Sequence, residues 1–83
     1  MDLIDLYLEH ERDHPPLLLA DIERHPTSGS LDATSNLFNF RIDFDRQQVT
    51  IEEDGSYFHD RDEDREMVVG LAEFAGRLSR ARG

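Results

Sequence analysis

The stretch Phe38-Asn39-Phe40-Arg41-Ile42-Asp43-Phe44-Asp45 decides the fold of this chain. Apolar and polar side chains alternate along its whole length, which is the period of a β-strand that has one buried and one solvated face. The alternation resumes at Val49-Thr50-Ile51-Glu52 after a short polar link. Two alternating segments joined by so few residues predict an antiparallel hairpin, with strands over 37–45 and 49–54.

The segment before the hairpin has the spacing of two short helices. Apolar residues recur every three or four positions over 3–12, and an apolar run over 16–24 follows Pro15 and Pro16. A residue that precedes proline avoids the α-helical region, so the first helix should end by Asp13. Proline is well accepted in the first turn of a helix, and the second helix can therefore begin at 16.

The segment after the hairpin predicts one further helix. Its apolar residues follow the i, i+3, i+4, i+7 spacing of an amphipathic helix: Leu71, Phe74, Ala75 and Leu78. Upstream of it, 56–59 follows an Asp-Gly turn signal and is a candidate for a third, shorter strand. The stretch 67–69 is either a final strand or the start of the helix, and the sequence leaves both open.

These elements predict one α+β domain over 1–83. A small antiparallel sheet, built on the hairpin 37–45/49–54, is packed by an N-terminal helix pair and a C-terminal helix. Thr27-Ser28-Gly29-Ser30 is expected to be a loop because of its composition, and Ser35 is also expected in a loop or turn. With helices on one face of the sheet, the other face should lie in solvent.

The composition excludes several classes of function. The chain has 83 residues, 37% of them hydrophobic, and its 19 acidic and 9 basic residues give a net charge of −10. A phosphate backbone or an anionic membrane repels such a chain, so we expect neither direct nucleic-acid binding nor membrane binding. The lack of cysteine excludes a disulfide scaffold, a cysteine-ligated zinc finger and a thiol nucleophile. Without a basic leader region or an apolar run of about 18 residues, a soluble cytoplasmic protein is expected.

One motif points to metal chemistry. His10-Glu11-Arg12-Asp13-His14 matches H-E-x-x-H, in which two histidines on one helix face bind zinc and the glutamate activates a water. The motif needs a continuous helix and a third ligand, for which His25 and His59 are the candidates. Because Pro15 follows the second histidine and ends the helix there, we expect solvent-facing histidines at a helix end. A small zinc hydrolase that uses His10, Glu11 and His14 is the less favoured alternative.

Neither a calcium loop nor another catalytic arrangement is predicted. Asp60, Asp62 and Asp64 have the spacing of the first three ligands of a calcium loop, but Arg65 and Leu71 replace the glycine and the bidentate glutamate that such a loop needs. The serines lack a nucleophile elbow, and the glycines form no phosphate-binding loop. We therefore expect no metal site, no cofactor and no enzymatic activity.

The densest charge lies between Glu52 and Glu66. This segment carries eight acidic residues and two arginines, a net charge of −6. Such a run can serve solubility alone, or it can form a surface that meets a basic site on another protein. It includes aromatic residues, and an aromatic anchor surrounded by charge is typical of a tight interface. The residues expected to bind a partner are Glu52, Glu53, Asp54, Tyr57, Phe58, Asp60, Asp62, Glu63, Asp64 and Glu66. Asp43 and Asp45 of the hairpin are the second choice.

The hairpin and the closing stretch Val68-Val69-Gly70-Leu71-Ala72-Glu73-Phe74-Ala75-Gly76-Arg77-Leu78 have a form found in one family. The stretch is a short apolar segment followed by L-x-x-F-x-x-x-L, and over 37–78 the chain resembles small bacterial immunity proteins of contact-dependent growth inhibition and other polymorphic toxin systems. The resemblance implies a non-enzymatic inhibitor that binds one cognate toxin domain, often a nuclease. The acidic surface favours a basic toxin domain. The alternative is a nucleic-acid-mimicking inhibitor of a DNA- or RNA-binding protein.

Overall fold

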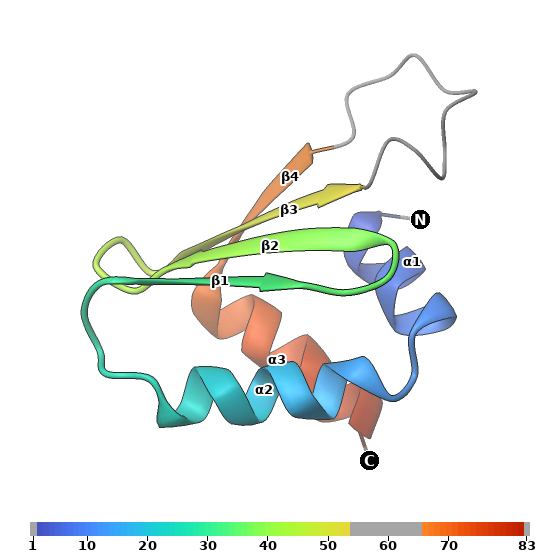
Figure 1. The fold of residues 1–83 in the computed structure, drawn as a ribbon, viewed down its shortest axis with the longest axis horizontal. Coiled ribbons are helices and arrows are strands. Elements are labelled where there is room, and N and C mark those ends of the chain that lie inside the picture. The colour runs from blue at the N-terminus through green and yellow to red at the C-terminus, as the bar shows by residue number, and fades with distance from the viewer. Residues whose placement is uncertain (1, 54–65, 83) are drawn as a thin grey trace.

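The computed structural model describes residues 2–53 and 66–82 of the chain. Within these residues, three helices pack against one face of a four-stranded sheet (Figure 1). The elements are, in chain order, α1 (Leu3–His10), α2 (His14–Arg24), β1 (Ser30–Thr34), β2 (Phe38–Asp43), β3 (Gln48–Glu53), β4 (Glu66–Gly70) and α3 (Leu71–Arg82). Neighbouring strands are antiparallel, in the order β1-β2-β3-β4. The predicted α+β class is therefore confirmed, with a helix pair before the sheet and a helix after it.

The alternation in β2 decides which face of the sheet is buried. Phe38, Phe40 and Ile42 are at most 3% exposed, and Val49 and Ile51 of β3 are fully buried beside them. The register continues this apolar face across all four strands. One cross-strand row consists of Ala33, Phe40, Ile51 and Met67, and the next of Leu31, Ile42, Val49 and Val69.

Each helix contributes side chains to the same core. They are Ile4 and Tyr7 from α1, Leu18, Leu19 and Ile22 from α2, and Phe74 and Leu78 from α3. The ring of Tyr7 meets Phe40 and Phe38 edge-on, with centroid distances of 4.7 Å and 5.8 Å. Edge-to-face pairs of this kind contribute about 0.5–1.5 kcal/mol beyond the burial of their area. Tyr7 therefore ties α1 to the strand that organises the sheet.

Strand β1 corrects the sequence prediction, which treats Ser30 as part of a loop. Its two inward residues, Leu31 and Ala33, are only half-buried, so the apolar alternation of this segment is weak. Pairing with β2 decides its conformation instead, because an edge strand gains ladder hydrogen bonds whatever its own propensity. Ser35 lies just beyond the end of the strand, outside regular structure, as expected.

Strand β4 resolves the alternative that the sequence leaves open at 67–69. This stretch is a strand, and α3 begins directly after it at Leu71. Val69 is buried and Met67 half-buried on the helix side, whereas Val68 is 55% exposed on the opposite face. The third strand expected over 56–59 lies outside the described residues.

Two helix boundaries differ from the predicted ones. Helix α1 ends at His10 rather than at 12, and α2 begins at His14 rather than at 16. Pro15 and Pro16 therefore lie inside the first turn of α2, where the missing N–H groups have no intrahelical acceptor in any case.

The turn after β2 explains why this strand ends at Asp43, two residues earlier than predicted. The Asp43 carboxylate accepts a hydrogen bond from the Arg46 N–H at 3.1 Å, and Gln47 has a left-handed φ of 55°. Phe44 stays 93% buried although it is outside the strand, as its exposed fraction is 7%. Its ring stacks on His25 at a centroid distance of 4.2 Å, so the turn is packed against the end of α2.

An ion-pair cluster joins the start of α1 to α3. Asp2 and Asp5 form a capping box, in which the Asp5 N–H donates to Asp2 Oδ1 at 2.9 Å. Arg77 of α3 donates to Oδ2 of Asp2 at 2.9 Å and also to Asp5, and its side chain is only 17% exposed. These contacts lower the pKa of Asp2 to about 2, chiefly through the hydrogen bond from Arg77.

Truncation of a core residue tests the packing of α3. Phe74 is fully buried, so Phe74→Ala removes its packing and leaves a cavity, and we expect it to lower the free energy of unfolding by about 3–5 kcal/mol. Leu17→Ala is the matched control, because Leu17 is 65% exposed and its loss should cost less than about 0.5 kcal/mol. Urea denaturation followed by circular dichroism measures both values. Similar losses in the two variants would contradict this core.

The cluster around Arg77 predicts a loss of stability in acid. The pKa of Asp2 lies at about 2 in the folded chain, below its ordinary 3.8, so this carboxylate stabilises the fold above pH 3.8 and ceases to do so as the pH falls through 2. Asp2→Asn should therefore be less stable than the parent at neutral pH, and the difference should shrink between those two pH values. Urea denaturation at a series of pH values measures it. A difference that does not vary with pH would refute this linkage.

Candidate partner-binding surface

The sheet face opposite the helices carries the outward side chains of all four strands; we call it the open face. Cross-strand register arranges these side chains in rows. One row consists of Asp32, Arg41, Thr50 and Val68, and the next of Thr34, Asn39, Glu52 and Glu66. A third row consists of Ser30, Asp43, Gln48 and Gly70. Most of these residues are exposed, so a partner that reaches this face meets polar and charged groups directly.

The open face is acidic at the end where β3 finishes and β4 begins. Arg41, the one cation among the described residues of these rows, donates through Nε to Asp32 Oδ1 at 3.2 Å. Glu52 and Glu66 are exposed and stand directly opposite each other in the register.

A shallow hollow of about 460 Å³ marks the same part of the open face. It is lined by residues of all four strands: Asp32, Ala33, Thr34, Asn39, Phe40, Arg41, Thr50, Glu52 and Glu66. Side chains from separate strands meet here only because the sheet is antiparallel and in this register. The carboxylates of Asp32, Glu52 and Glu66 are part of its lining.

The structure brings together only part of the predicted binding set. Glu52 and Glu66 are neighbours on the open face, whereas Glu53 is 6% exposed and lies in register with Phe38 on the helix side. Glu53 is thus a structural neighbour of the core and not part of the exposed surface. The other predicted residues lie outside the described residues: Asp54, Tyr57, Phe58, Asp60, Asp62, Glu63 and Asp64.

The second-choice aspartates lie at the opposite end of the hairpin. Asp43 is half-buried, and its carboxylate binds the backbone and approaches the guanidinium of Arg46 at 3.9 Å. Asp45 is exposed in the turn. Asp43 therefore holds the turn together, which leaves only Asp45 of this pair freely accessible.

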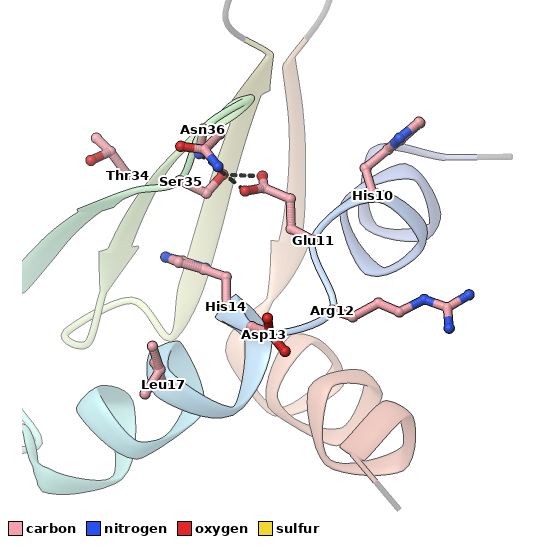
Figure 2. A pocket seen from close by; sticks show the side chains of 9 residues that line it. All are labelled: His10, Glu11, Arg12, Asp13, His14, Leu17, Thr34, Ser35 and Asn36. Atoms are coloured by element: carbon pink, nitrogen blue, oxygen red, sulfur yellow. Dashed lines mark hydrogen bonds between the residues drawn. The ribbon is translucent and has the colours of Figure 1, made fainter.

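The H-E-x-x-H motif does not lie on one helix (Figure 2). Helix α1 ends at His10, Glu11 is its C-cap, Asp13 is the N-cap of α2, and His14 is the first residue of α2. Figure 2 shows the side chains of His10 and His14 pointing in different directions. Within 2–53 and 66–82, no three His, Asp or Glu side chains come close enough together to hold a metal ion.

Glu11 instead organises the turn between β1 and β2. Its carboxylate accepts hydrogen bonds from the Ser35 hydroxyl, from the Asn36 N–H at 3.0 Å and from the Leu37 N–H at 3.4 Å (Figure 2). Glu11, Ser35 and Asn36 also line a hollow of about 530 Å³ between the α1–α2 link and this turn. The motif's glutamate thus joins the helices to the sheet.

His14 has a structural contact of its own. Its Nδ1 lies 2.6 Å from the hydroxyl of Tyr7, in a hydrogen bond that joins the first turn of α2 to α1. Burial, and secondarily the charge of Glu11, raises the pKa of Tyr7. The phenol is therefore neutral under ordinary conditions, and a neutral hydroxyl that is hydrogen-bonded to His14 suits this buried position between aromatic rings.

Sequence reasoning missed Asp32 and Thr34, since it placed no strand before residue 37. The alternation in β2 did contain the signal for Asn39 and Arg41, whose positions between phenylalanines put them on the outer face. No signal in the sequence pairs Glu52 with Glu66, because that neighbourhood depends on the pairing of β3 with β4.

Comparison with known proteins identifies no relative: no protein-family model, no curated protein and no solved structure matches this chain. Among the described helices, none has the length and apolar character needed to cross a bilayer. A function for the chain therefore rests on its own surface geometry and charge.

The role of Glu11 can be tested by its removal. Glu11→Ala leaves the donors of the β1–β2 turn without their carboxylate, and we expect a loss of about 1–3 kcal/mol in the free energy of unfolding. Glu9→Ala, an exposed position on α1, is the control and should change the stability by less than about 0.5 kcal/mol. Urea denaturation measures both. Equal small effects would show that the carboxylate does not stabilise the turn.

Proposed function

We propose that this chain is an immunity protein, a stoichiometric inhibitor that binds and neutralises a cognate, basic toxin domain through its acidic surface. The observation that carries the proposal is the exposed pair Glu52 and Glu66, placed side by side on a sheet face that α1, α2 and α3 leave uncovered. Two exposed carboxylates on neighbouring strands offer the cationic side chains of a partner two acceptors for charge-assisted hydrogen bonds.

The charge of the whole chain supports the same partner chemistry. The net charge is −10, and the described arginines that form ion pairs all use aspartates: Arg24 with Asp21, Arg41 with Asp32, Arg46 with Asp43, and Arg77 with Asp2 and Asp5. Glu52 forms no ion pair within the described residues, so its charge is available to a cation from outside. Such a surface attracts a basic domain from a distance and speeds its encounter.

The inhibition would be steric and electrostatic. A nuclease holds its substrate with arginines and lysines that bind phosphate oxygens, and carboxylates can occupy the same groups. Glu52 and Glu66 provide two carboxylates at one end of the open face, and the sequence over 54–65 adds five more acidic residues together with Tyr57 and Phe58. In this proposal the carboxylates pair with the cationic substrate groove, and an aromatic side chain supplies the apolar anchor of the interface.

Capture of the partner is the first experiment. The tagged protein is used to pull down partners from its native host, including the product of the adjacent upstream gene, at low and at high salt. One stoichiometric, basic, toxin-like protein supports the proposal. Several unrelated nucleic-acid-binding proteins that are all lost at high salt would favour a nucleic-acid mimic instead. If no basic partner is captured at either salt concentration, both the immunity protein and the nucleic-acid mimic are contradicted.

Charge reversal then locates the surface on the captured partner. Glu52→Lys with Glu66→Lys should lower the association rate by about tenfold or more, because the steering charge is inverted at the contact. Glu9→Lys with Glu23→Lys changes the net charge equally at exposed helix positions and is the matched control. Surface plasmon resonance over a salt series measures the rates. If both double variants lower the association rate equally, the open face is not part of the interface. If the association rate does not depend on salt, the electrostatic mechanism is wrong.

A further inference from the structure

Strand β4 is the last strand of the sheet within residues 2–53 and 66–82, and β3 is the strand of that part of the chain with which it pairs. Leu71 N–H donates to Gln47 O at 2.8 Å, in line with the register that joins β4 to β3. Backbone groups of an antiparallel strand point alternately toward and away from the neighbouring strand. Met67 and Val69 therefore point their N–H and C=O groups toward β3, and Val68 points its own away from the sheet. Figure 1 shows β4 at the border of the sheet, with the helices beneath its face.

The side chains of β4 do not protect this edge. Edge strands are commonly blocked by charged side chains, a proline or a bulge, and in β4 the only charged residue is Glu66 at its first position. The centre of β4 is instead Val68, which is 55% exposed and is, with Leu17, one of two exposed large hydrophobic residues in the described part of the chain. Gly70 is exposed as well. An apolar, β-branched residue with outward backbone groups is suited to pair with another strand.

We infer that β4 pairs antiparallel with β4 of a second copy of this chain, about a two-fold axis at Val68. In the register that uses all five residues of the strand, Val68 lies opposite the second copy's Val68, and the two exchange a pair of backbone hydrogen bonds. Met67 lies opposite the second copy's Val69 on the helix side. Glu66 lies opposite the second copy's Gly70, so no two charges of like sign face each other.

The other edge of the sheet does not offer the same pairing. Ser35 N–H donates to Phe38 O at 2.8 Å, and Phe44 N–H donates to Gly29 O at 2.9 Å, which fixes the alternation of β1. Asp32 therefore occupies the position in β1 that Val68 occupies in β4. A two-fold pairing of β1 over its full length would set Asp32 against the second copy's Asp32, an unfavourable contact of like charges. The two edges thus differ at their central residue, and full-length two-fold pairing is favoured at β4 over β1.

The resulting dimer would have one continuous sheet of eight strands. Residues directly opposite each other in an antiparallel pair place their side chains on the same face, so both open faces lie on one side and all helices on the other. The contact is small and the two chains carry −10 each, so the dimer should be weak and should become tighter as salt screens the repulsion. This salt dependence is opposite in sign to that proposed for a basic partner.

Sedimentation velocity of the purified chain up to millimolar concentration, at low and high salt, tests the inference. We expect a monomer–dimer equilibrium that salt strengthens. Val68→Asp should weaken the dimer by about tenfold or more, because it removes the apolar contact and sets two carboxylates face to face. Thr34→Asp adds the same charge at the β1 edge. It should weaken the dimer only by the general repulsion that one more negative charge on each chain adds. A monomer at all concentrations, or equal weakening by both variants, overturns the proposal.

A cross-linking experiment tests the same edge without a disruptive substitution. Because the chain has no cysteine, Val68→Cys introduces a single thiol, and a short bismaleimide should link two copies at the concentrations where the dimer forms. Thr34→Cys is the matched control and should give little linked product. Circular dichroism confirms that each variant is folded. Equal linking of the two variants, or none with Val68→Cys under dimer conditions, would show that β4 is not the contact.

Discussion

Burial of the alternating apolar residues of β2 is the constraint on which the rest of the structure depends. Phe38, Phe40 and Ile42 can be buried together only if β1 and β3 pair in registers that extend the same apolar face. A slip of one residue would exchange them for Asn39, Arg41 and Asp43. The helices must then cover that one face, since a chain of 83 residues has too little apolar surface for two. An uncovered, polar second face is therefore a consequence of the core.

How far the sequence predicts this structure depends on how local each signal is. The hairpin, the helix at Leu71 and the solvated face follow from periodicity within single segments, and all three are present. Strand β1 and the Glu52–Glu66 pair depend on contacts between strands, so no local pattern contains them. Glu53 shows a different limit: the period-two pattern of its strand places position 53 on the same face as Val49 and Ile51, but its charge made it a candidate for the exposed surface.

The H-E-x-x-H pattern illustrates how helix continuity decides the meaning of a motif. Two histidines four residues apart share a face only within one helix, and here a helix ends at the first and another begins at the second. The proline after the second histidine carries this information in the sequence. The sequence does not show the structural role of Glu11, because the groups that donate hydrogen bonds to its carboxylate lie in a turn more than twenty positions away. The carboxylate joins segments that are distant in sequence, and this is how a small core acquires a fixed link between its helices and its sheet.

The open face and the β4 edge can act independently because they present different chemical groups in perpendicular directions. The face offers side chains that stand out of the sheet, whereas the edge offers N–H and C=O groups that lie within its plane. Glu66 belongs to both, yet its carboxylate faces the row of Glu52 while its backbone lies in β4. Edge pairing would therefore leave the acidic row exposed and repeat it on the second copy. A basic partner would then meet two acidic rows on one side of one sheet. In this arrangement the apolar pairing at Val68 would bring the acidic rows of two copies onto one surface.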